Sequence, residues 1–329
     1  MEEKRVRISD IAEELGLSTA TVSNVLHGKT KKVSEETVRR VQAALETHQY
    51  IPSMAGILLA QNTSRIIGVV VNDHEKYESH ALSDPYIASA LDSLSNEIEG
   101  VGLFMMVKKA TSPGEITRFA SMWNLEGLVL MGFCDQDYDH LRAHMRIPFV
   151  VYDGCGDAGR AFNITVDNFD GGFQVGRHFG AQGHQKALCI SDNDVFLDRE
   201  RFEGFRAGFP GAAELLLVPM EKAARMAFYR ENLTRFRAVT AIFAVSDYYA
   251  LELMEFLRGQ GLRVPEDLAL AGFDDIPMSA LVSLTSVRQD VSLRAKIAVE
   301  KLRALKEGLE TEQQVTLPVQ LIERRSSGK

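Results

Sequence analysis

A run of small and polar residues near the amino terminus has the composition needed to read the edges of DNA bases. Residues 18–26 read STATVSNVL, and Val22, Val25 and Leu26 fall on one side of a helix. The other side carries four small or polar residues: Thr19, Ala20, Ser23 and Asn24. Small side chains let a helix lie deep in the major groove, where an Asn amide can bond a base edge. A capped surface helix has the same pattern, so this face alone leaves both interpretations open.

Two other patterns suggest enzyme or metal chemistry, and both are weaker. Residues 154–159 fit the GxGxxG spacing of dinucleotide sites. Such a site needs a helix directly after the glycines, whereas residues 160–167 read as extended chain. His140 and His144 are spaced to share a helix face, but no third metal ligand is near them. We therefore expect no cofactor, no metal and no enzyme activity, and we keep a dinucleotide-dependent oxidoreductase as the remote alternative.

The elements that would position the reading helix form a helix-turn-helix. Apolar residues recur at helical spacing in 8–15, with Ser9 placed as the N-cap and Gly16 as the stop. A second helix covers about 18–26, and a third runs from its N-cap, Ser34, to about His48. A helix, a Gly-containing turn and a second short helix are typical of this DNA-binding motif.

From residue 66 the chain alternates apolar runs with helical stretches. Continuously apolar runs are typical of parallel strands covered on both faces, so the pattern predicts a doubly wound α/β fold. Two sheets of five or six strands suit the number of runs better than one large sheet. Ligands of such folds bind beyond the carboxyl ends of the strands, here between two lobes. The nine expected strands are 66–71, 103–107, 128–131, 149–152, 164–166, 187–190, 215–218, 241–245 and 268–271.

Charge and composition narrow the class further. Residues 1–65 carry nine Lys and Arg against eight Asp and Glu, while the whole chain has a net charge of −8, so only the amino-terminal segment is non-acidic. No apolar run is long enough to span a membrane, and the charged start does not resemble a signal peptide. The three cysteines form no CxxC pair. These observations predict a cytoplasmic protein with no membrane partner.

The motifs, taken in order, resemble those of the LacI/GalR family of bacterial transcriptional regulators. The resemblance covers nearly the whole chain and is carried by 6–12 (VRISDIA), 16–26 (GLSTATVSNVL), 28–29, 33–37, 50–52, 67–71, 166–168, 183–184, 201–205 (RFEGF), 240–244, 246–247, 261–268 (GLRVPEDL), 272–275 (GFDD), 284–289 (LTSVRQ) and 321–326. It implies a periplasmic-binding-protein-like core, a pseudopalindromic operator, a small-molecule effector and a homodimer. No heptad tail follows residue 326, which also favours a dimer over a coiled-coil tetramer.

The resemblance also implies a domain plan. A DNA-binding headpiece spans 1–50, a hinge helix with its linker spans 51–65, and the effector-binding and dimerisation core spans 66–329. We expect the core's first lobe to hold about 66–157 and 289–315. The second lobe then holds about 158–286 and 316–329.

The DNA contacts implied by the family fall on the headpiece and hinge. Positions matching Thr19, Ala20 and Asn24 read bases, and those matching Ser18, Thr21 and Ser23 contact the DNA backbone. Asn24 stands where Arg is common. Leu59 matches the family's minor-groove wedge. The hinge departs from the family in carrying Gly56, which weakens an already short helix by about 1 kcal/mol relative to Ala.

The effector contacts implied by the family come from widely separated positions. They match Tyr86, Asp153, Arg201, Ser246 and Asp274, with Ser246 replacing a frequent Asn. An Arg with two carboxylates suits a sugar or polyol, and a nucleoside- or purine-sensing regulator is the alternative. The stretch from Asp73 to Asp84 is about eight residues longer than usual. We expect it near the cleft mouth, where a longer surface loop is the simpler interpretation.

Overall fold

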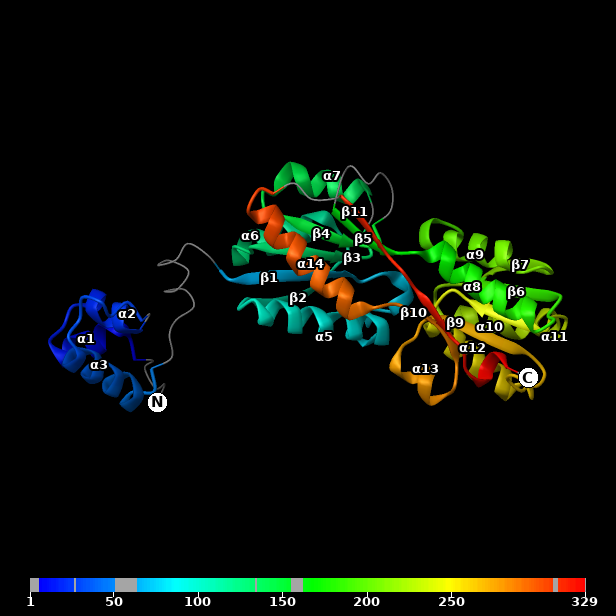
Figure 1. The fold of residues 1–329 in the computed structure, drawn as a ribbon, viewed down its shortest axis with the longest axis horizontal. Coiled ribbons are helices and arrows are strands. Elements are labelled where there is room, and N and C mark those ends of the chain that lie inside the picture. The colour runs from blue at the N-terminus through cyan, green and yellow to red at the C-terminus, as the bar shows by residue number, and fades with distance from the viewer. Residues whose placement is uncertain are drawn as a thin grey trace. The chain divides into compact units, whose positions relative to one another are not determined.

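The computed structural model describes residues 6–26, 28–50, 64–133, 135–154, 162–309 and 313–328 (Figure 1). Contacts divide the chain into two units, residues 1–63 and 64–329. Gly56 and Leu59 lie outside the described residues, so the hinge helix and its wedge stay predictions.

The first unit is the expected trio of short helices. They are α1 (Ile8–Leu15), α2 (Thr19–Leu26) and α3 (Glu35–Thr47). A small apolar core joins them: Ile11, Ala12, Val22, Val25, Val41 and Ala44. Ser34 caps α3 by accepting the Thr37 N–H, as predicted. Ser9 is not the cap of α1, because the helix starts earlier and Asp10 accepts the N–H of Arg7, the capping residue, at 2.8 Å.

The first lobe of the second unit is built on a six-stranded parallel sheet in the order β11-β5-β4-β3-β1-β2. Helices α5 and α14 pack together on one face, and α6 and α7 cover the other. The strands are β1 (Ile66–Asn72), β2 (Phe104–Ala110), β3 (Gly127–Met131), β4 (Phe149–Tyr152), β5 (Phe162–Val166) and β11 (Gln314–Leu317). The helices are α5 (Pro85–Gly100), α6 (Pro113–Trp123), α7 (Asp135–His144) and α14 (Val291–Lys306), with two 3-10 turns, η1 (Glu75–Tyr77) and η2 (Ala81–Ser83).

The second lobe has a sheet in the order β12-β10-β9-β8-β6-β7, in which β12 is antiparallel to β10. Its strands are β6 (Lys186–Ser191), β7 (Ala212–Leu217), β8 (Ala241–Ala244), β9 (Ala269–Asp274), β10 (Thr285–Arg288) and β12 (Gln320–Ile322). Its helices are α8 (Asn168–Ala181), α9 (Phe196–Gly208), α10 (Lys222–Glu231), α11 (Leu233–Arg237), α12 (Asp247–Gly259) and α13 (Pro277–Leu281), followed by η3 (Arg325–Ser327). The predicted fold class, a helical headpiece and two doubly wound lobes, is confirmed.

The predicted lobe boundary before residue 158 is wrong. β5 pairs with β4 and with β11 in the first sheet, so the chain first passes to the second lobe after Val166. Among the described residues, further passages follow β10 and β11. Each passage leaves the end of a β-strand in one sheet and enters the other lobe, so three connecting segments join the lobes.

Candidate functional site

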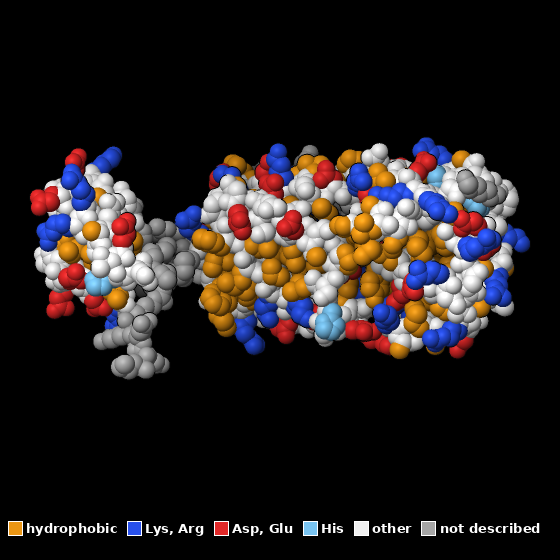
Figure 2. Space-filling view, turned by 90° about the horizontal axis from the view of Figure 1, so that it is seen from below, with side chains coloured by type: hydrophobic (Ala, Val, Ile, Leu, Met, Phe, Trp, Pro, Cys, Tyr) orange, Lys and Arg blue, Asp and Glu red, His pale blue; other side chains and the backbone are white. Residues whose placement is uncertain are grey.

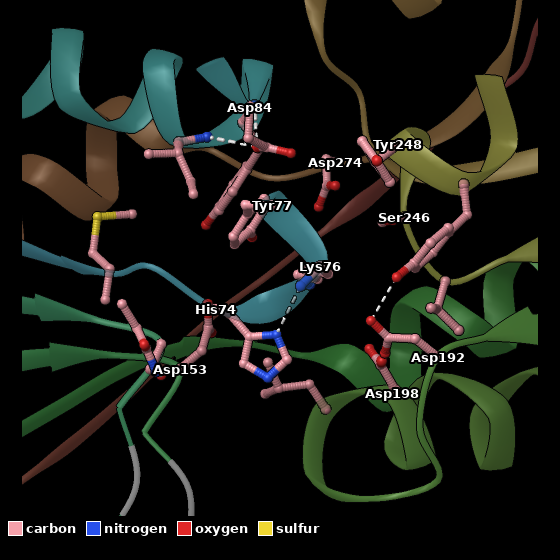
Figure 3. A pocket seen from close by; sticks show the side chains of 18 of the residues that line it. His74, Lys76, Tyr77, Asp84, Asp153, Asp192, Asp198, Ser246, Tyr248 and Asp274 are labelled. Carbon is pink, nitrogen blue, oxygen red and sulfur yellow. Dashed lines mark hydrogen bonds between the residues drawn. The ribbon is translucent and has the colours of Figure 1, made fainter. Parts of the chain in front are cut away.

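A cleft between the two lobes lies at the carboxyl ends of the strands. It has a volume of about 400 Å³, within the range of small-molecule sites. The residues that end β1, β3 and β4 line it from the first lobe, and those that follow β6, β8 and β9 line it from the second. All five residues implied by the family line this cleft, and Figure 3 shows three of them: Asp153, Ser246 and Asp274.

Arg201 is fixed within the wall of the cleft. Its Nε donates to Asn168 Oδ1 at 2.9 Å, and Nη1 donates to the Val245 carbonyl at 2.7 Å. The guanidinium carbon lies 3.7 Å from the centre of the Phe273 ring, and the residue is 6% exposed. No described residue hydrogen-bonds Nη2, so one edge of a rigid, charged donor remains for a ligand.

Asp274 is the last residue of β9 and has a positive φ of 116°. Gln289 Nε2 donates to its Oδ1 at 2.7 Å. Burial raises the pKa of this carboxyl well above its ordinary range, Arg201 opposes the shift and Asp247 adds to it. A carboxyl that resists ionisation can both donate to and accept from ligand hydroxyls.

Asp153 and Tyr86 are joined by a buried arginine that the sequence analysis missed. Arg294 Nη2 lies 2.7 Å from Asp153 Oδ1, and its Nη1 donates to the Tyr86 hydroxyl at 2.7 Å. Burial acts to lower the pKa of Arg294, but Asp153 and Tyr86 outweigh it and the pKa rises, so the guanidinium stays charged. Arg294 is thus the ion-pair partner of Asp153 inside the protein, and the same guanidinium orients the Tyr86 hydroxyl.

Ser246 and Tyr152 supply further polar groups. Ser246 lines the cleft at the N-cap of α12, where its side chain makes no capping bond. Tyr152 is 2% exposed and also lines the cleft, and no described residue hydrogen-bonds its hydroxyl. A buried hydroxyl without a partner costs free energy, which a ligand in the cleft would recover.

The stretch from Asp73 to Asp84 lies closer to the site than the surface-loop interpretation suggested. His74, Lys76 and Tyr77 line the cleft, and all three are seen around its centre in Figure 3. On the second lobe the sequence analysis also missed Asp192, Asp198 and Tyr248, which line the opposite wall.

In the first unit, α2 presents the expected polar face. Thr19, Ala20 and Asn24 are exposed, and Ser23 is half-buried. The Ser18 hydroxyl accepts the Thr21 N–H at 3.1 Å and lies 2.9 Å from the Thr21 hydroxyl. Ser18 therefore caps α2 and pairs with the Thr21 hydroxyl, while Thr19, Ala20 and Asn24 are exposed on the helix surface.

The two patterns with weaker signals have ordinary surroundings. The chain after the GxGxxG stretch forms β5, and residues 155–159 lie outside the described residues. His140 and His144 stack at 4.2 Å on α7. No described residues form a cluster of three or more metal-ligating side chains.

Comparisons with known proteins decide the family. A model of bacterial regulatory proteins of the lacI family matches residues 7–53, and a model of a periplasmic binding protein-like domain matches residues 177–327. The HTH-type transcriptional repressor PurR of Haemophilus influenzae is 29% identical over 342 residues, covering 97% of this chain and 98% of the relative. The chain belongs to the LacI/GalR family. The predicted family, and the prediction of a regulator rather than an enzyme, are confirmed.

Other LacI/GalR members agree with the whole-chain match. PurR of Aliivibrio fischeri strain MJ11 is 29% identical over 316 residues, covering 90% of both chains. A lac repressor dimer bound to operator and the anti-inducer ONPF superposes with a TM-score of 0.83 at 24% identity, covering 98% of this chain and 99% of that one. A CelR–cellobiose complex gives a TM-score of 0.70 at 23% identity, covering 98% and 100%. These structures share the fold.

Proposed function

We propose that this chain is a sequence-specific DNA-binding repressor whose operator affinity is controlled by a sugar or related polyol bound between the lobes. The ligand class rests on two residues that line the same cleft: Arg201, which has a free guanidinium edge, and Asp274, a carboxyl able to donate and accept. Relatives of the same fold support it, since CelR is described in complex with cellobiose and another member with D-xylulofuranose.

A nucleobase or nucleoside is the second candidate. Aromatic side chains line the same cleft, among them Tyr77, Phe196 and Tyr248. Such rings can stack on a planar base as well as on the apolar face of a sugar. The same aromatic side chains could therefore contact a ligand of either class.

In the DNA-binding half of the proposal, α2 enters the major groove with Thr19, Ala20 and Asn24 toward the bases. Ser18, Thr21 and Ser23 lie toward the phosphates, and Leu59 wedges into the minor groove. A regulator that binds an operator acts where the chromosome lies, so we assign it to the cytoplasm. No helix among the described residues is long and apolar enough to cross a membrane.

The functional protein is a homodimer in this proposal. Several large apolar side chains are exposed on the core, including Phe104 at 53% and, on α13, Met278 at 48% and Leu281 at 79%. Figure 2 shows apolar side chains gathered on the face of the core seen from below. An apolar patch of this kind marks an association surface, and a second copy suits a two-fold operator.

The test is a calorimetric screen of the full-length protein against neutral sugars, polyols, nucleosides and nucleobases. Each binder is then added to an operator-binding assay on selected DNA. A sugar or polyol that binds and changes operator affinity supports the proposal. Binding of nucleobases alone would move the effector to the second class, and binders that leave operator affinity unchanged would contradict the regulatory role.

A further inference from the structure

The loop from Asp73 to Asp84 is held in place by hydrogen bonds and by a buried side chain. Lys109 of β2 donates from Nζ to Asp73 Oδ2 at 2.8 Å and also to the Ser79 carbonyl. Ala81 is fully buried in the first lobe. Asp84 accepts two N–H groups at the start of α5, both at 3.0 Å. These anchors fix where the loop's tip can lie.

The tip reaches the second lobe. Glu78 Oε1 accepts the backbone N–H of Lys222 at 3.1 Å, at the first residue of α10. This bond lies beside the cleft, whose lining includes Met220. The loop therefore spans from one lobe to the other and brings its remaining side chains into the cleft.

Lys76 of this loop lines the same cleft as two carboxylates of the second lobe, Asp192 and Asp198, and interacts electrostatically with both. Its Nζ lies 5.1 Å from the centre of the Tyr77 ring. In Figure 3 Lys76 lies near the middle of the cleft, with Asp192 and Asp198 on the second-lobe side. The Asn193 amide holds these two carboxylates together, with Nδ2 at 2.6 Å from Asp192 Oδ1 and 2.8 Å from Asp198 Oδ2. No ion pair joins Lys76 to any described residue, which leaves room for a ligand oxygen between the groups.

Further hydrogen bonds set the two carboxylates in place. The Tyr249 hydroxyl donates to Asp192 Oδ2 at 2.5 Å, and the Ser191 hydroxyl donates to Asp198 Oδ2 at 2.9 Å. Both carboxylates thus keep fixed positions in the wall. A charge placed opposite them meets a prearranged site.

Lys76, Asp192 and Asp198 shift one another's pKa values. Burial acts to lower the pKa of Lys76, but Tyr77, Asp192 and Asp198 outweigh it and the net shift is upward. Burial acts to raise the pKa of Asp192, but Lys76 and the Tyr249 hydrogen bond outweigh it, so the pKa falls. Burial raises the pKa of Asp198, and Arg201 only partly opposes the shift. Lys76 and Asp192 therefore stay charged, and each stabilises the charge of the other.

We propose that Lys76 is the resident counter-ion of the Asp192–Asp198 pair, and that it makes the cleft select a neutral hydroxylated effector over one that carries an ammonium group. The specificity part rests on the proposed function; the counter-ion part does not. Without Lys76 the wall would keep two carboxylates and the nearby guanidinium of Arg201, which acts mainly on Asp198, so Asp192 would attract amines. With a lysine ammonium already in the same cleft, the wall offers ligand hydroxyls both acceptors and a donor.

Removing the lysine should open a site for a free amine. Lys76→Ala deletes three methylenes and the ammonium, which propylammonium replaces in size and charge. We expect propylammonium chloride to raise the melting temperature of full-length Lys76→Ala saturably. Its apparent dissociation constant should be about tenfold or more below that of the parent, as for one partly desolvated charge pair. Sodium chloride at the same ionic strength is the salt control.

A matched lysine and a double variant identify the partner. Lys186 is exposed and begins β6, at the amino end of the strand that Asp192 follows, so Lys186→Ala should gain no propylammonium response. Adding Asp192→Asn to Lys76→Ala should abolish the gain. An equal response in the parent, Lys76→Ala and Lys186→Ala, or a response unaffected by Asp192→Asn, would overturn the counter-ion role.

The specificity arm uses D-glucose and D-glucosamine, together with any neutral sugar from the screen and its amino analogue. Lys76→Ala should shift the ratio of their affinities toward the amino sugar by about tenfold. An unchanged ratio would overturn the selective role. If amine rescue occurs but neither parent nor variant binds any sugar, the proposed effector class fails while the counter-ion role stands.

Discussion

The residue with the clearest expected effect is Arg201, because its position is fixed before a ligand arrives. Arg201→Ala should abolish the effector response and leave operator binding intact, with a loss of coupling of about 1–3 kcal/mol. Fluorescence anisotropy of labelled operator, with and without effector, measures it. Arg199→Ala is the matched control, since Arg199 lies on the same helix in an exposed pair with Glu203. A variant that still responds at the parent's effector concentrations would place the site elsewhere.

Asn24 should decide one base of the operator. Asn reads adenine through N6 and N7, whereas Arg reads guanine through O6 and N7. Thr19 and Ala20 are small and exposed beside it, so α2 can lie close enough for the shorter amide. Asn24→Arg should shift the preference from A·T toward G·C at one position of each half-site, by about 1–3 kcal/mol. Selection from randomised half-sites reports this directly, and identical selections would show that Asn24 reads no base.

Asp247 should make stability depend on pH. It is fully buried and accepts from Ser279, Ser286 and the Ile276 N–H. Burial raises its pKa to about 6 although these hydrogen bonds oppose the shift. The folded state therefore holds the proton more tightly than the unfolded state, whose pKa is near 3.8. The contribution of Asp247 to the free energy of unfolding is greatest below about pH 4. It falls by about 3 kcal/mol as the pH rises to about 6.

Urea unfolding of the parent and Asp247→Asn between pH 4 and pH 7 tests this. The variant does not titrate at this position, so the parent's stability relative to it should fall across that window. A difference that stays constant with pH would show that the carboxyl is ionised throughout.

At the residue level, sequence reasoning found the side chains that belong to family motifs and missed those held by packing. All five predicted cleft residues line the cleft. Arg294 was missed although it shares the buried face of α14 with Ala298 and Leu302, where a charged residue signals a buried partner. That partner, Asp153, is distant in sequence, so no local pattern joins the two.

At the level of elements, the contact between α8 and α9 positions the site. Both helices carry glycines where their backbones meet, and a Cβ added at Gly172 would lie 2.0 Å from the Arg201 carbonyl oxygen. Gly172→Ala should therefore push α9 away and displace Arg201. We expect a loss of stability of at least about 1–3 kcal/mol and weaker effector binding.

The control for this variant is Gly100→Ala. Gly100 ends α5, and a Cβ there would meet nothing within 4 Å, so stability should stay within about 0.5 kcal/mol of the parent. Thermal melts and calorimetric titration of both variants provide the comparison. Normal effector binding by a folded Gly172→Ala would contradict the positioning role of the helix contact.

Among the elements, the long apolar strands were predictable and the connecting strands were not. The nine expected strands are present. Most of them, such as β1, β3, β4, β8 and β9, are buried along nearly their whole length, which leaves an apolar run in the sequence. The three that were missed, β10, β11 and β12, have three or four residues each and partly polar sequences. β5 joins the first sheet by pairing with β4, which precedes it, and with β11, about 150 residues later in the chain. Its short apolar run shows that it is a strand but not which sheet it joins.

At the level of the whole molecule, the proposed dimer links the effector-binding core to the operator. Leu281 is 79% exposed on α13, with Met278 one turn before it. In a two-fold interface each substitution occurs twice and faces the same patch. Leu281→Glu then removes apolar burial of about 1.5–3 kcal/mol for each side chain and places two carboxylates at the interface.

We expect Leu281→Glu to raise the dimer dissociation constant by about a hundredfold or more, making the protein largely monomeric at micromolar concentration. Met122→Glu is the control, because Met122 is 69% exposed on α6, which covers the sheet face opposite α5. Sedimentation velocity measures the oligomer directly. Because one headpiece alone contacts only half of a pseudopalindromic operator, the monomeric variant should also lose most operator affinity while keeping effector affinity. A Leu281→Glu protein that sediments as the parent dimer would show that α13 faces solvent in the assembly.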